Sequence, residues 1–371
     1  MKVAVIGCGT MGKGIAYLFL KYGNFVQIYD ENKLSVENAI KYFDSYIKEE
    51  YMSRLKILEN LEEIDKDSDI LIEAIVEDLE KKKLLFKTIE TMVNKQTIIA
   101  TNTSSLSINE LSESLENKER FLGMHFFNPP AVMKLVEIIK SDWTKEEYLN
   151  RVVEIAKNIS KEVVICKDSP GFIVNRIARP FYLQALRLYE SGISYELIDK
   201  IIKVIGFKMG PFELMDLIGI DINYSVSKII YEKTKLERLK PSKIQEEMIK
   251  NGLLGMKVGK GFYKYPRESE KLEFKYRLNL YGTYQMKNFK FFTIGYGAEV
   301  FSYEDENIIK ELRKLDFEHF VLHNLGFSIS EKIINAIKLE ANEVYKSNIA
   351  TKEDINKAMR LGANYPIDVI D

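Results

Sequence analysis

The chain has 371 residues, of which 46% are hydrophobic and 29% charged, values typical of a globular protein of two or three domains. Its 54 basic and 55 acidic residues nearly cancel, which argues against nucleic acid as a partner. No apolar run approaches the roughly 20 residues of a membrane span. With no signal-peptide pattern and only two cysteines, the sequence predicts a cytoplasmic protein without a membrane partner.

The first thirty residues predict a strand, a helix and a second strand. Residues 2–6 form a short apolar run, the motif GCGTMG follows at once, and a helical pattern leads to a second apolar run at 25–29. A Gly-x-Gly-x-x-Gly motif in this context, with Asp30 closing the second strand, is typical of a dinucleotide-binding fold. Asp30 would accept from a ribose 2′-hydroxyl and repel a 2′-phosphate, which favours NAD over NADP. Glycines that serve only the packing of a βαβ unit are the alternative.

Each position of the motif has a physical reason. Gly7 permits the tight turn, Gly9 lets a pyrophosphate approach the backbone, and Gly12 lets the helix pack closely on the strand. We expect the phosphates at the first amides of the helix, which are those of Thr10 and Met11.

Strands and helices alternate as far as residue 168. Helices are expected at residues 32–58, 79–92 and 144–159, and strands at residues 70–75, 97–100, 121–126, 134–139 and 163–166. This alternation predicts an α/β fold with a Rossmann-type, mainly parallel, doubly wound sheet. Ligands of such sheets bind beyond the C-terminal ends of the strands. Four polar side chains fall at these ends: Asp30, Glu77, Ser104 and His125.

One of only three histidines, His125, ends the strand expected at 121–126, and Glu137 follows twelve positions later. Pro129 and Pro130 lie between them, so the chain must turn back before it reaches Glu137. A His and a Glu brought together across a turn can form a general base with an orienting carboxylate. The alternative is a buried histidine whose polar atoms are satisfied by backbone. The position at the ligand-binding edge favours a site residue.

Beyond residue 168 the strand signals vanish and an all-α domain is expected. The predicted organisation is an NAD-binding domain at 1–168, a helical domain at 169–267, an irregular connecting region at 268–325 and a tail at 326–371. The connecting region has a weak hairpin pattern at 288–300 and a helical one at 304–315. In the tail, ANEVYKS at 341–347 echoes ALRLYES at 185–191, which predicts a partial repeat of the helical domain.

Eight motifs in order resemble the 3-hydroxyacyl-CoA dehydrogenase family. They are GCGTMG at 7–12, EAIVED at 73–78, NTSSL at 102–106, HFFNPP at 125–130, KLVEII at 134–139, DSPGFIVNR at 168–176, MGPFELMD at 209–216 and GKGFYKY at 259–265. The tail repeat resembles the duplicated helical domain of multifunctional fatty-acid oxidation proteins. No hydratase half is present, so the resemblance implies dehydrogenase activity only.

The resemblance implies NAD-dependent, reversible oxidation of an (S)-3-hydroxyacyl-CoA to the 3-oxoacyl-CoA, as in fatty-acid metabolism. His125 would be the catalytic base and Glu137 would accept from its other ring nitrogen. Ser104 and Asn175 would bind the substrate oxygens. On the residues alone, a turn or cap serine and a helix-capping asparagine are the alternatives for these two.

The resemblance also implies cofactor contacts, at positions that match Glu77, Lys82, Asn102, Asn128 and Lys257. Taken alone, without the resemblance, Glu77 and Lys82 are expected to be solvated surface charges. No metal site is expected. The segment after Asp30, where the family binds CoA, is several residues shorter here and has no matching Ser/Lys pair, so no CoA-binding residues are assigned.

Two other functions stay open at this point. One is a related dehydrogenase of a free hydroxy acid or sugar acid, and the other is a non-catalytic NAD-binding relative. The partner expected from the resemblance is an acyl-CoA substrate. The helical repeats allow a homodimer or a pseudo-dimeric monomer.

Overall fold

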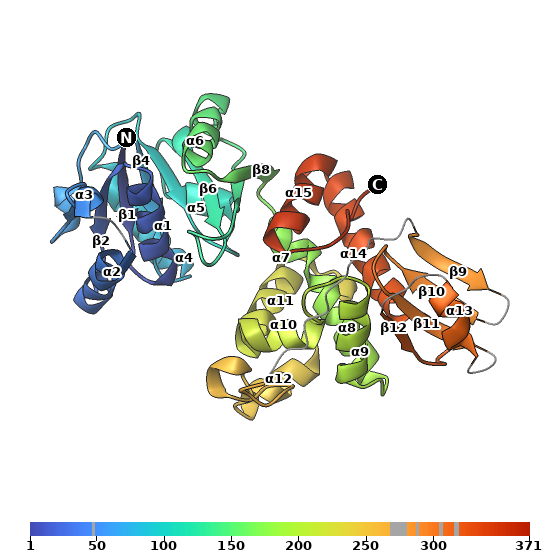
Figure 1. Ribbon diagram of the computed structural model, residues 1–371. Helices are drawn as coiled ribbons and strands as arrows, with labels where there is room; N and C mark the ends of the chain where they lie inside the picture. Colours follow the sequence, from blue (N-terminus) through green and yellow to red (C-terminus); the bar gives the residue numbers. More distant parts are fainter. Residues whose placement is uncertain (47–48, 268–279, 287–288, 304–306, 315–318) are drawn as a thin grey trace. The chain divides into compact units, whose positions relative to one another are not determined.

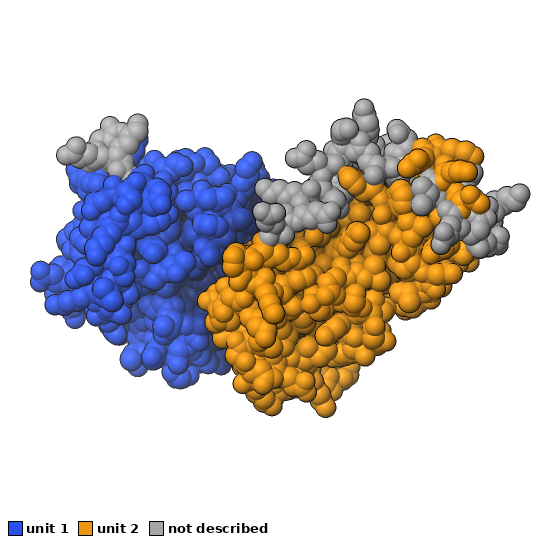
Figure 2. All heavy atoms as spheres, turned by 60° about the horizontal axis from the view of Figure 1, so that its bottom comes forward, with its two compact units in different colours: residues 1–174, 345–362 blue, residues 175–344, 363–371 orange. Residues whose placement is uncertain are grey.

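The computed structural model describes residues 1–46, 49–267, 280–286, 289–303, 307–314 and 319–371 (Figure 1). The chain divides into two compact units, which are coloured separately in Figure 2. The first unit contains residues 1–174 and 345–362, and the second contains residues 175–344 and 363–371. The chain therefore leaves the first unit after residue 174 and returns to it near the C-terminal end.

One eight-stranded sheet forms the centre of the first unit (Figure 1). Its strands, in spatial order, are β3 (Leu55–Ile57), β2 (Phe25–Tyr29), β1 (Lys2–Ile6), β4 (Ile70–Glu73), β5 (Ile98–Thr101), β6 (Phe121–Phe126), β7 (Leu135–Lys140) and β8 (Glu162–Lys167). All neighbours are parallel except β6 and β7. The predicted Rossmann-type sheet is confirmed.

Seven helices belong to the described part of this unit. They are α1 (Thr10–Lys21), α2 (Lys33–Tyr46), α3 (Glu49–Met52), α4 (Leu79–Glu90), α5 (Ile108–Ser112), α6 (Glu146–Asn158) and α15 (Lys352–Gly362). Val3 and Val5 of β1 join Ile15 and Phe19 of α1 in one buried cluster. The apolar runs of the central strands are buried because helices cover parallel sheets on both faces.

The helix predicted over residues 32–58 is wrong beyond residue 52, where α3 ends. Helix α2 ends at Tyr46, residues 47–48 lie outside the described residues, and β3 pairs in parallel with β2. The N–H of Val26 donates to Arg54 O at 2.9 Å, and the N–H of Leu58 donates to Ile28 O at 3.0 Å. Strand β2 would otherwise present unpaired backbone groups, and pairing them outweighs the local helical spacing of the apolar residues.

The C-terminal helix α15 packs against β7 and β8 of the first sheet. The N–H of Lys167 donates to Ile349 O at 2.9 Å, which ties the segment before α15 to β8. The predicted partial repeat of the helical domain stays a prediction. Its two segments form α14 (Ile329–Lys346) and α15, and α15 belongs to the first unit.

Helices make up most of the second unit. Besides α14 they are α7 (Val174–Ile177), α8 (Arg179–Glu190), α9 (Tyr195–Val204), α10 (Pro211–Ile218), α11 (Ile220–Thr234) and α12 (Lys243–Lys250). This confirms the predicted helical domain after the sheet.

The Gly-rich segment 259–265 is held by a buried carboxylate. Asp216 of α10 accepts from the backbone N–H of Phe262 at 3.0 Å and of Tyr263 at 2.9 Å, and from the Tyr265 hydroxyl at 3.0 Å. A Cβ on Gly261 would lie 1.9 Å from Asp216 Oδ1, so only glycine fits there. The Asp216 side chain therefore fixes this segment against α10.

A second sheet lies in the region where the sequence patterns are weak (Figure 1). Its strands, in the order β12, β11, β10, β9, are β12 (Phe320–Leu322), β11 (Ala298–Tyr303), β10 (Phe289–Thr293) and β9 (Gly282–Met286), and α13 (Ile308–Lys314) follows β11 in sequence. Strands β10 and β11 form the predicted hairpin. The predicted helix at 304–315 is found only as α13, and residues 268–279, 304–306 and 315 lie outside the described residues.

Within the described part of the chain, no helix combines the length and apolar content that crossing a membrane requires. The same residues contain no group of three or more His, Cys, Asp or Glu side chains able to hold a metal ion.

Candidate active site

The antiparallel pairing of β6 and β7 places His125 directly opposite Glu137. The Nδ1 atom of His125 lies 2.7 Å from Glu137 Oε2, and the two residues are 4% and 0% exposed. Opposite residues on neighbouring strands are natural side-chain partners, and the turn that joins β6 to β7 accounts for the twelve-residue spacing. The predicted His–Glu pair is therefore present.

The carboxylate decides which ring nitrogen carries the proton. An ionised Glu137 can only accept, so a neutral His125 donates through Nδ1–H and keeps a lone pair on Nε2. No hydrogen bond to Nε2 is found among the described residues. The Nε2 atom is therefore able to take a proton from a ligand.

Two aromatic rings hold the imidazole in place. The ring centroid of His125 lies 4.7 Å from that of Phe127 and 5.7 Å from that of Phe172. Phe172 belongs to the motif DSPGFIVNR, which follows β8. This packing limits rotation of the imidazole about its side-chain bonds, so the orientation set by Glu137 is kept.

Glu137 also fixes the chain that leads out of the first unit. Its Oε1 accepts from the backbone N–H of Ile173 at 3.2 Å and of Val174 at 2.9 Å. Three donors thus share the two oxygens of one fully buried carboxylate. The next residue in the chain is Asn175, the first residue of the second unit.

A second carboxylate, Glu77, organises the loop after β5. Its Oε1 accepts from Thr103 Oγ1 at 2.6 Å, from the backbone N–H groups of Ser104 at 3.0 Å and Ser105 at 3.1 Å, and from Ser105 Oγ at 2.9 Å. Burial raises the pKa of Glu77, but the Lys82 charge and these hydrogen bonds outweigh it and hold the pKa below its usual range. The backbone of Ser104 is therefore fixed by Glu77.

Lys82 is buried rather than solvated, and it lies between two carboxylates. It is 1% exposed, and its Nζ is 2.5 Å from Glu73 Oε1 and 3.4 Å from Glu77 Oε2. Glu73, at the end of β4, is 0% exposed, and burial raises its pKa against the opposing effect of Lys82. The interpretation of Lys82 as a surface charge is wrong, because the end of β4 supplies a buried partner that the local sequence does not reveal.

Breaking this pair should be costly. We expect Lys82→Met to lower the free energy of unfolding of the first unit by about 3–5 kcal/mol, because Glu73 is left buried and uncompensated. The control is Lys83→Met, whose lysine is partly exposed and 3.8 Å from Glu110. It should change stability by about 1 kcal/mol or less. Denaturant unfolding measures both, and an equally small effect for Lys82→Met would contradict the assignment.

The Gly-rich turn has the geometry expected of a phosphate site. Gly7 has a φ of +100°, and a Cβ there would lie 2.5 Å from Ala74 O. A Cβ on Gly12 would lie 1.7 Å from Gly7 O, whereas a Cβ on Gly9 would meet nothing within 4 Å. Gly9 therefore leaves open space in front of the first turn of α1, where Thr10 and Met11 begin the helix. These residues fit a dinucleotide pyrophosphate.

Asp30 lies at the end of β2, beside the turn. Its Oδ2 accepts from the backbone N–H of Cys8 at 2.7 Å, and its Oδ1 accepts from that of Asn32 at 2.8 Å. Each carboxylate oxygen has a second lone pair, so a ribose hydroxyl can still donate to it. Burial, followed by the Asp30 charge, raises the pKa of the Cys8 thiol to about 12, which keeps that thiol neutral.

Asn102 fixes the end of the strand that carries His125. The Oδ1 of Asn102, after β5, accepts from the backbone N–H of Phe126 at 2.9 Å and so holds the end of β6. Asn128 is exposed, three residues beyond His125.

The turn that follows Asn128 is held by Lys161, whose Nζ donates to Pro130 O at 2.5 Å and Met133 O at 2.6 Å. Sequence reasoning missed Lys161, which no motif includes.

Lys161 allows a prediction about pH. Burial, followed by the Lys21 charge, lowers its pKa from 10.5 to about 8. The unfolded chain then binds the proton more tightly, so the contribution of this residue to stability rises as the pH increases from about 8 towards 10.5. The difference in free energy of unfolding between wild type and Lys161→Met should grow in favour of wild type over this range. A difference independent of pH, in parallel denaturant titrations, would contradict the prediction.

Two of the predicted site residues belong to the second unit. Asn175 lies in α7, and Lys257 pairs with Asp221 at 2.6 Å on the helical unit. The residues that the structure brings together in the first unit are His125 and Glu137 as one group, and Glu77, Lys82 and the Ser104 backbone as another.

A Rossmann-type sheet with an open Gly-rich turn, and a His–Glu pair near the C-terminal end of a strand, together define a dinucleotide-dependent oxidoreductase. Comparison with protein families identifies the family within this class of oxidoreductases. The family model described as "3-hydroxyacyl-CoA dehydrogenase, NAD binding domain" matches residues 2–169, and that described as "3-hydroxyacyl-CoA dehydrogenase, C-terminal domain" matches residues 171–265. The chain therefore belongs to the 3-hydroxyacyl-CoA dehydrogenase family.

Individual relatives agree with this. The chain is 36% identical over 285 residues to a mitochondrial hydroxyacyl-coenzyme A dehydrogenase of Sus scrofa, over 71% of this chain and 90% of that protein. It is 36% identical over 280 residues to a 3-hydroxybutyryl-CoA dehydrogenase of Clostridioides difficile, over 71% and 99%. A solved 3-hydroxybutyryl-CoA dehydrogenase of Escherichia coli has a TM-score of 0.88 at 30% identity and covers 100% of this chain and 90% of that chain. The likeness to this last structure includes the part beyond residue 265.

Proposed function

We propose that the chain catalyses the reversible oxidation of an (S)-3-hydroxyacyl-CoA to the 3-oxoacyl-CoA, with His125 as the base. The observation that carries the proposal is the buried contact between His125 Nδ1 and Glu137, which leaves the lone pair on Nε2. NAD, when bound at the turn of Gly7, Gly9 and Gly12, supplies the acceptor for the hydride that leaves C3 of the substrate. The names of the relatives support the thioester as the substrate class.

The proton moves as the hydride leaves. The Nε2 atom of His125 takes the proton of the 3-hydroxyl group, and the ring becomes an imidazolium held at Nδ1 by Glu137. Ser104 and Asn175 bind the 3-oxygen and the thioester oxygen and position C3. In the reverse direction the imidazolium returns the proton to the 3-oxo oxygen.

The cofactor contacts form a second part of the proposal. Asp30 binds the adenosine ribose, while Asn102, Asn128 and Lys257 contact the cofactor directly. Glu77 contacts the cofactor as well as the backbone of Ser104. Lys82 is too buried for an extensive contact of its own, so we assign it the role of holding Glu77 in place.

One assay separates the candidate functions. Purified protein is mixed with NADH and either acetoacetyl-CoA or free acetoacetate, and NADH consumption is followed. Consumption with the thioester, and at least about 10²-fold less with the free acid, is expected if the CoA part contributes binding energy to the reaction. Equal rates, or a preference for the free acid, would indicate a dehydrogenase of free hydroxy acids. NADH binding without turnover of either compound would indicate a non-catalytic relative.

The assembly and the location are part of the proposal. A homodimer or a pseudo-dimeric monomer through the helical repeats is supported by the similarity between residues 185–191 and 341–347. Light scattering coupled to size exclusion distinguishes the two states.

We propose the cytoplasm as the location, which the two buried free cysteines support. Cell fractionation with an antibody against the chain tests it.

A further inference from the structure

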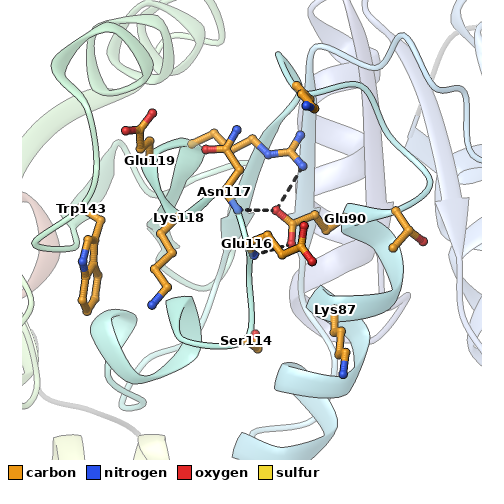
Figure 3. A pocket seen from close by; sticks show the side chains of 11 residues that line it. Lys87, Glu90, Ser114, Glu116, Asn117, Lys118, Glu119 and Trp143 are labelled. Carbon is orange, nitrogen blue, oxygen red and sulfur yellow. Dashed lines mark hydrogen bonds and ion pairs between the residues drawn. The ribbon is translucent and has the colours of Figure 1, made fainter.

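A pocket of about 710 Å³ lies in the first unit, at the opposite edge of the sheet from the His–Glu pair (Figure 3). Its lining comes from the end of α4, from η2 (Lys118–Arg120) just before β6, and from Trp143 just after β7. Because β6 and β7 are antiparallel, the start of one strand lies beside the end of the other. His125 is five residues along β6 from Arg120, a separation of roughly 16 Å at about 3.3 Å per residue.

The walls of this pocket are held by hydrogen bonds of the Glu90 and Arg120 side chains to the backbone. Glu90 of α4 accepts from the backbone N–H groups of Glu116 at 2.8 Å and Asn117 at 2.9 Å. Arg120, 1% exposed, donates from one guanidinium nitrogen to Asn94 O at 2.5 Å and Thr97 O at 3.1 Å. The pocket is therefore formed before any ligand arrives, and its volume lies in the usual range for small-molecule sites.

The turn that carries Trp143 is fixed to the same wall. The Thr144 hydroxyl donates to Phe121 O at 2.7 Å, and the N–H of Lys145 donates to Glu119 O at 3.0 Å. The indole nevertheless stays 41% exposed, and Lys118 Nζ lies 4.7 Å from its ring centroid. An aromatic ring on a fixed turn, with part of its surface open, is a platform on which a planar ligand can stack.

Positive charge in the pocket exceeds negative charge. Glu119 pairs with Lys145 at 2.6 Å, and Glu90 lies 3.5 Å from Arg120. Lys87, Lys95 and Lys118 have no carboxylate partner among the described residues. The Nε of Arg120 is also without a hydrogen-bond partner there. The pocket thus offers three unpaired ammonium groups against the single carboxylate of Glu116.

Positive charge lies both beside the indole, at Lys118, and away from it, at Lys87. In Figure 3, Trp143 and Lys118 lie at one end and Lys87 at the other, with Ser114 between them. A ligand that satisfies both ends has a flat ring at one end and several negative charges at the other. Lysine ammonium groups are common binders of phosphate, and bases of nucleotides stack on indole rings.

We propose that this pocket is a second nucleotide site, which binds the adenosine diphosphate group with the base on Trp143 and the phosphates at Lys87 and Lys95. The same group occurs in free ADP and in coenzyme A, which carries an additional 3′-phosphate. The site is separate from the turn of Gly7, Gly9 and Gly12, and its ligand is not consumed in the proposed reaction.

Trp143 itself supplies the measurement, because it is the only tryptophan in the chain. Its fluorescence is excited where adenine does not absorb, and the protein is titrated with ADP, with coenzyme A and with inorganic pyrophosphate. A saturable change with ADP or coenzyme A is expected. Lys87→Ala/Lys95→Ala should raise the apparent dissociation constant at least about tenfold, because two charged donors are lost. The matched control is Lys81→Ala, an exposed lysine of α4 outside the pocket, which should leave the constant unchanged.

The titrations test the proposal and also show which compound supplies the adenosine diphosphate group. Tighter binding of coenzyme A than of ADP assigns the site to the 3′-phosphorylated form, and the reverse order assigns it to the free nucleotide. No saturable change up to about 10 mM of either compound overturns the proposal, since weaker binding is not a specific site. Binding of pyrophosphate as tight as that of ADP overturns the role of Trp143, and equal effects in the control variant overturn the role of the lysines.

Discussion

His125→Gln is expected to lower kcat at least about 10²-fold for NADH-linked reduction of acetoacetyl-CoA, the low end of the effect of a general acid or base. Glutamine keeps polar atoms near the position of the ring but has no group that titrates near neutral pH. The change is measured as kcat under saturating thioester and NADH. Near-normal turnover in this variant would refute the role of His125.

The chain offers a matched control in His323, the other buried histidine that pairs with a glutamate among the described residues. Its Nε2 lies 2.8 Å from Glu299 Oε1 in the second sheet. Glu299 also accepts from the backbone N–H of Ser330 at 2.9 Å, so this pair fixes the start of α14. His323→Gln should therefore affect stability but leave kcat per folded enzyme within about twofold, because a structural pair makes no contact in the transition state.

Glu137→Gln is expected to lower kcat about as much as His125→Gln does, at least about 10²-fold, although the side chain keeps its size, because this carboxylate acts through His125. The carboxylate serves three donors, namely His125 Nδ1 and the backbone N–H groups of Ile173 and Val174. A glutamine that accepts from the two backbone groups must turn its NH₂ group towards His125. The ring then accepts at Nδ1, carries its proton on Nε2, and no longer has a base facing the substrate.

A double variant, His125→Gln/Glu137→Gln, tests whether the two residues act together. If His125 and Glu137 act as one unit, adding Glu137→Gln to His125→Gln should reduce kcat little further. Losses that multiply would mean that the two residues act independently. Circular dichroism of all three proteins checks that the variants keep the native fold.

The sequence predicts the His–Glu pair because both partners lie close together along the chain. A strand, two prolines and a second strand bring residues twelve apart back to each other, and the register of β6 and β7 places them opposite one another. The register of β6 and β7 and the choice of Nδ1 for the contact depend on the whole sheet. Local patterns do not contain that information.

Lys82 illustrates what a local pattern misses. It follows Lys81 and precedes Lys83 near the start of α4, and a run of lysines is usually solvated. In the structure only Lys82 meets the buried Glu73 at the end of β4. The helix begins at a cap, Asp78, which accepts from the N–H of Lys81 at 2.9 Å and so sets which lysine faces the sheet. Which lysine of α4 faces the sheet can be predicted only when the positions of β4 and α4 relative to each other are known.

The edges of both sheets follow the same rule. Strands β3 and β12 have three residues each, too few to produce an alternating pattern in the sequence. Each exists because its neighbour has backbone groups that need partners. The central strands β1, β4 and β5 have only four or five residues, but these are nearly continuous apolar runs, and they were predictable from the sequence for that reason.

The pH dependence of kcat/KM for oxidation of (S)-3-hydroxybutyryl-CoA, in wild type and in His125→Gln, is the most direct test of the assignment of His125 as the base. Oxidation needs the neutral imidazole, so wild-type kcat/KM should fall about tenfold per pH unit once that ring takes up a proton. The residual activity of His125→Gln should be flat over the same acidic range. If the variant keeps the same acid limb as wild type, another group is the base and the assignment is wrong.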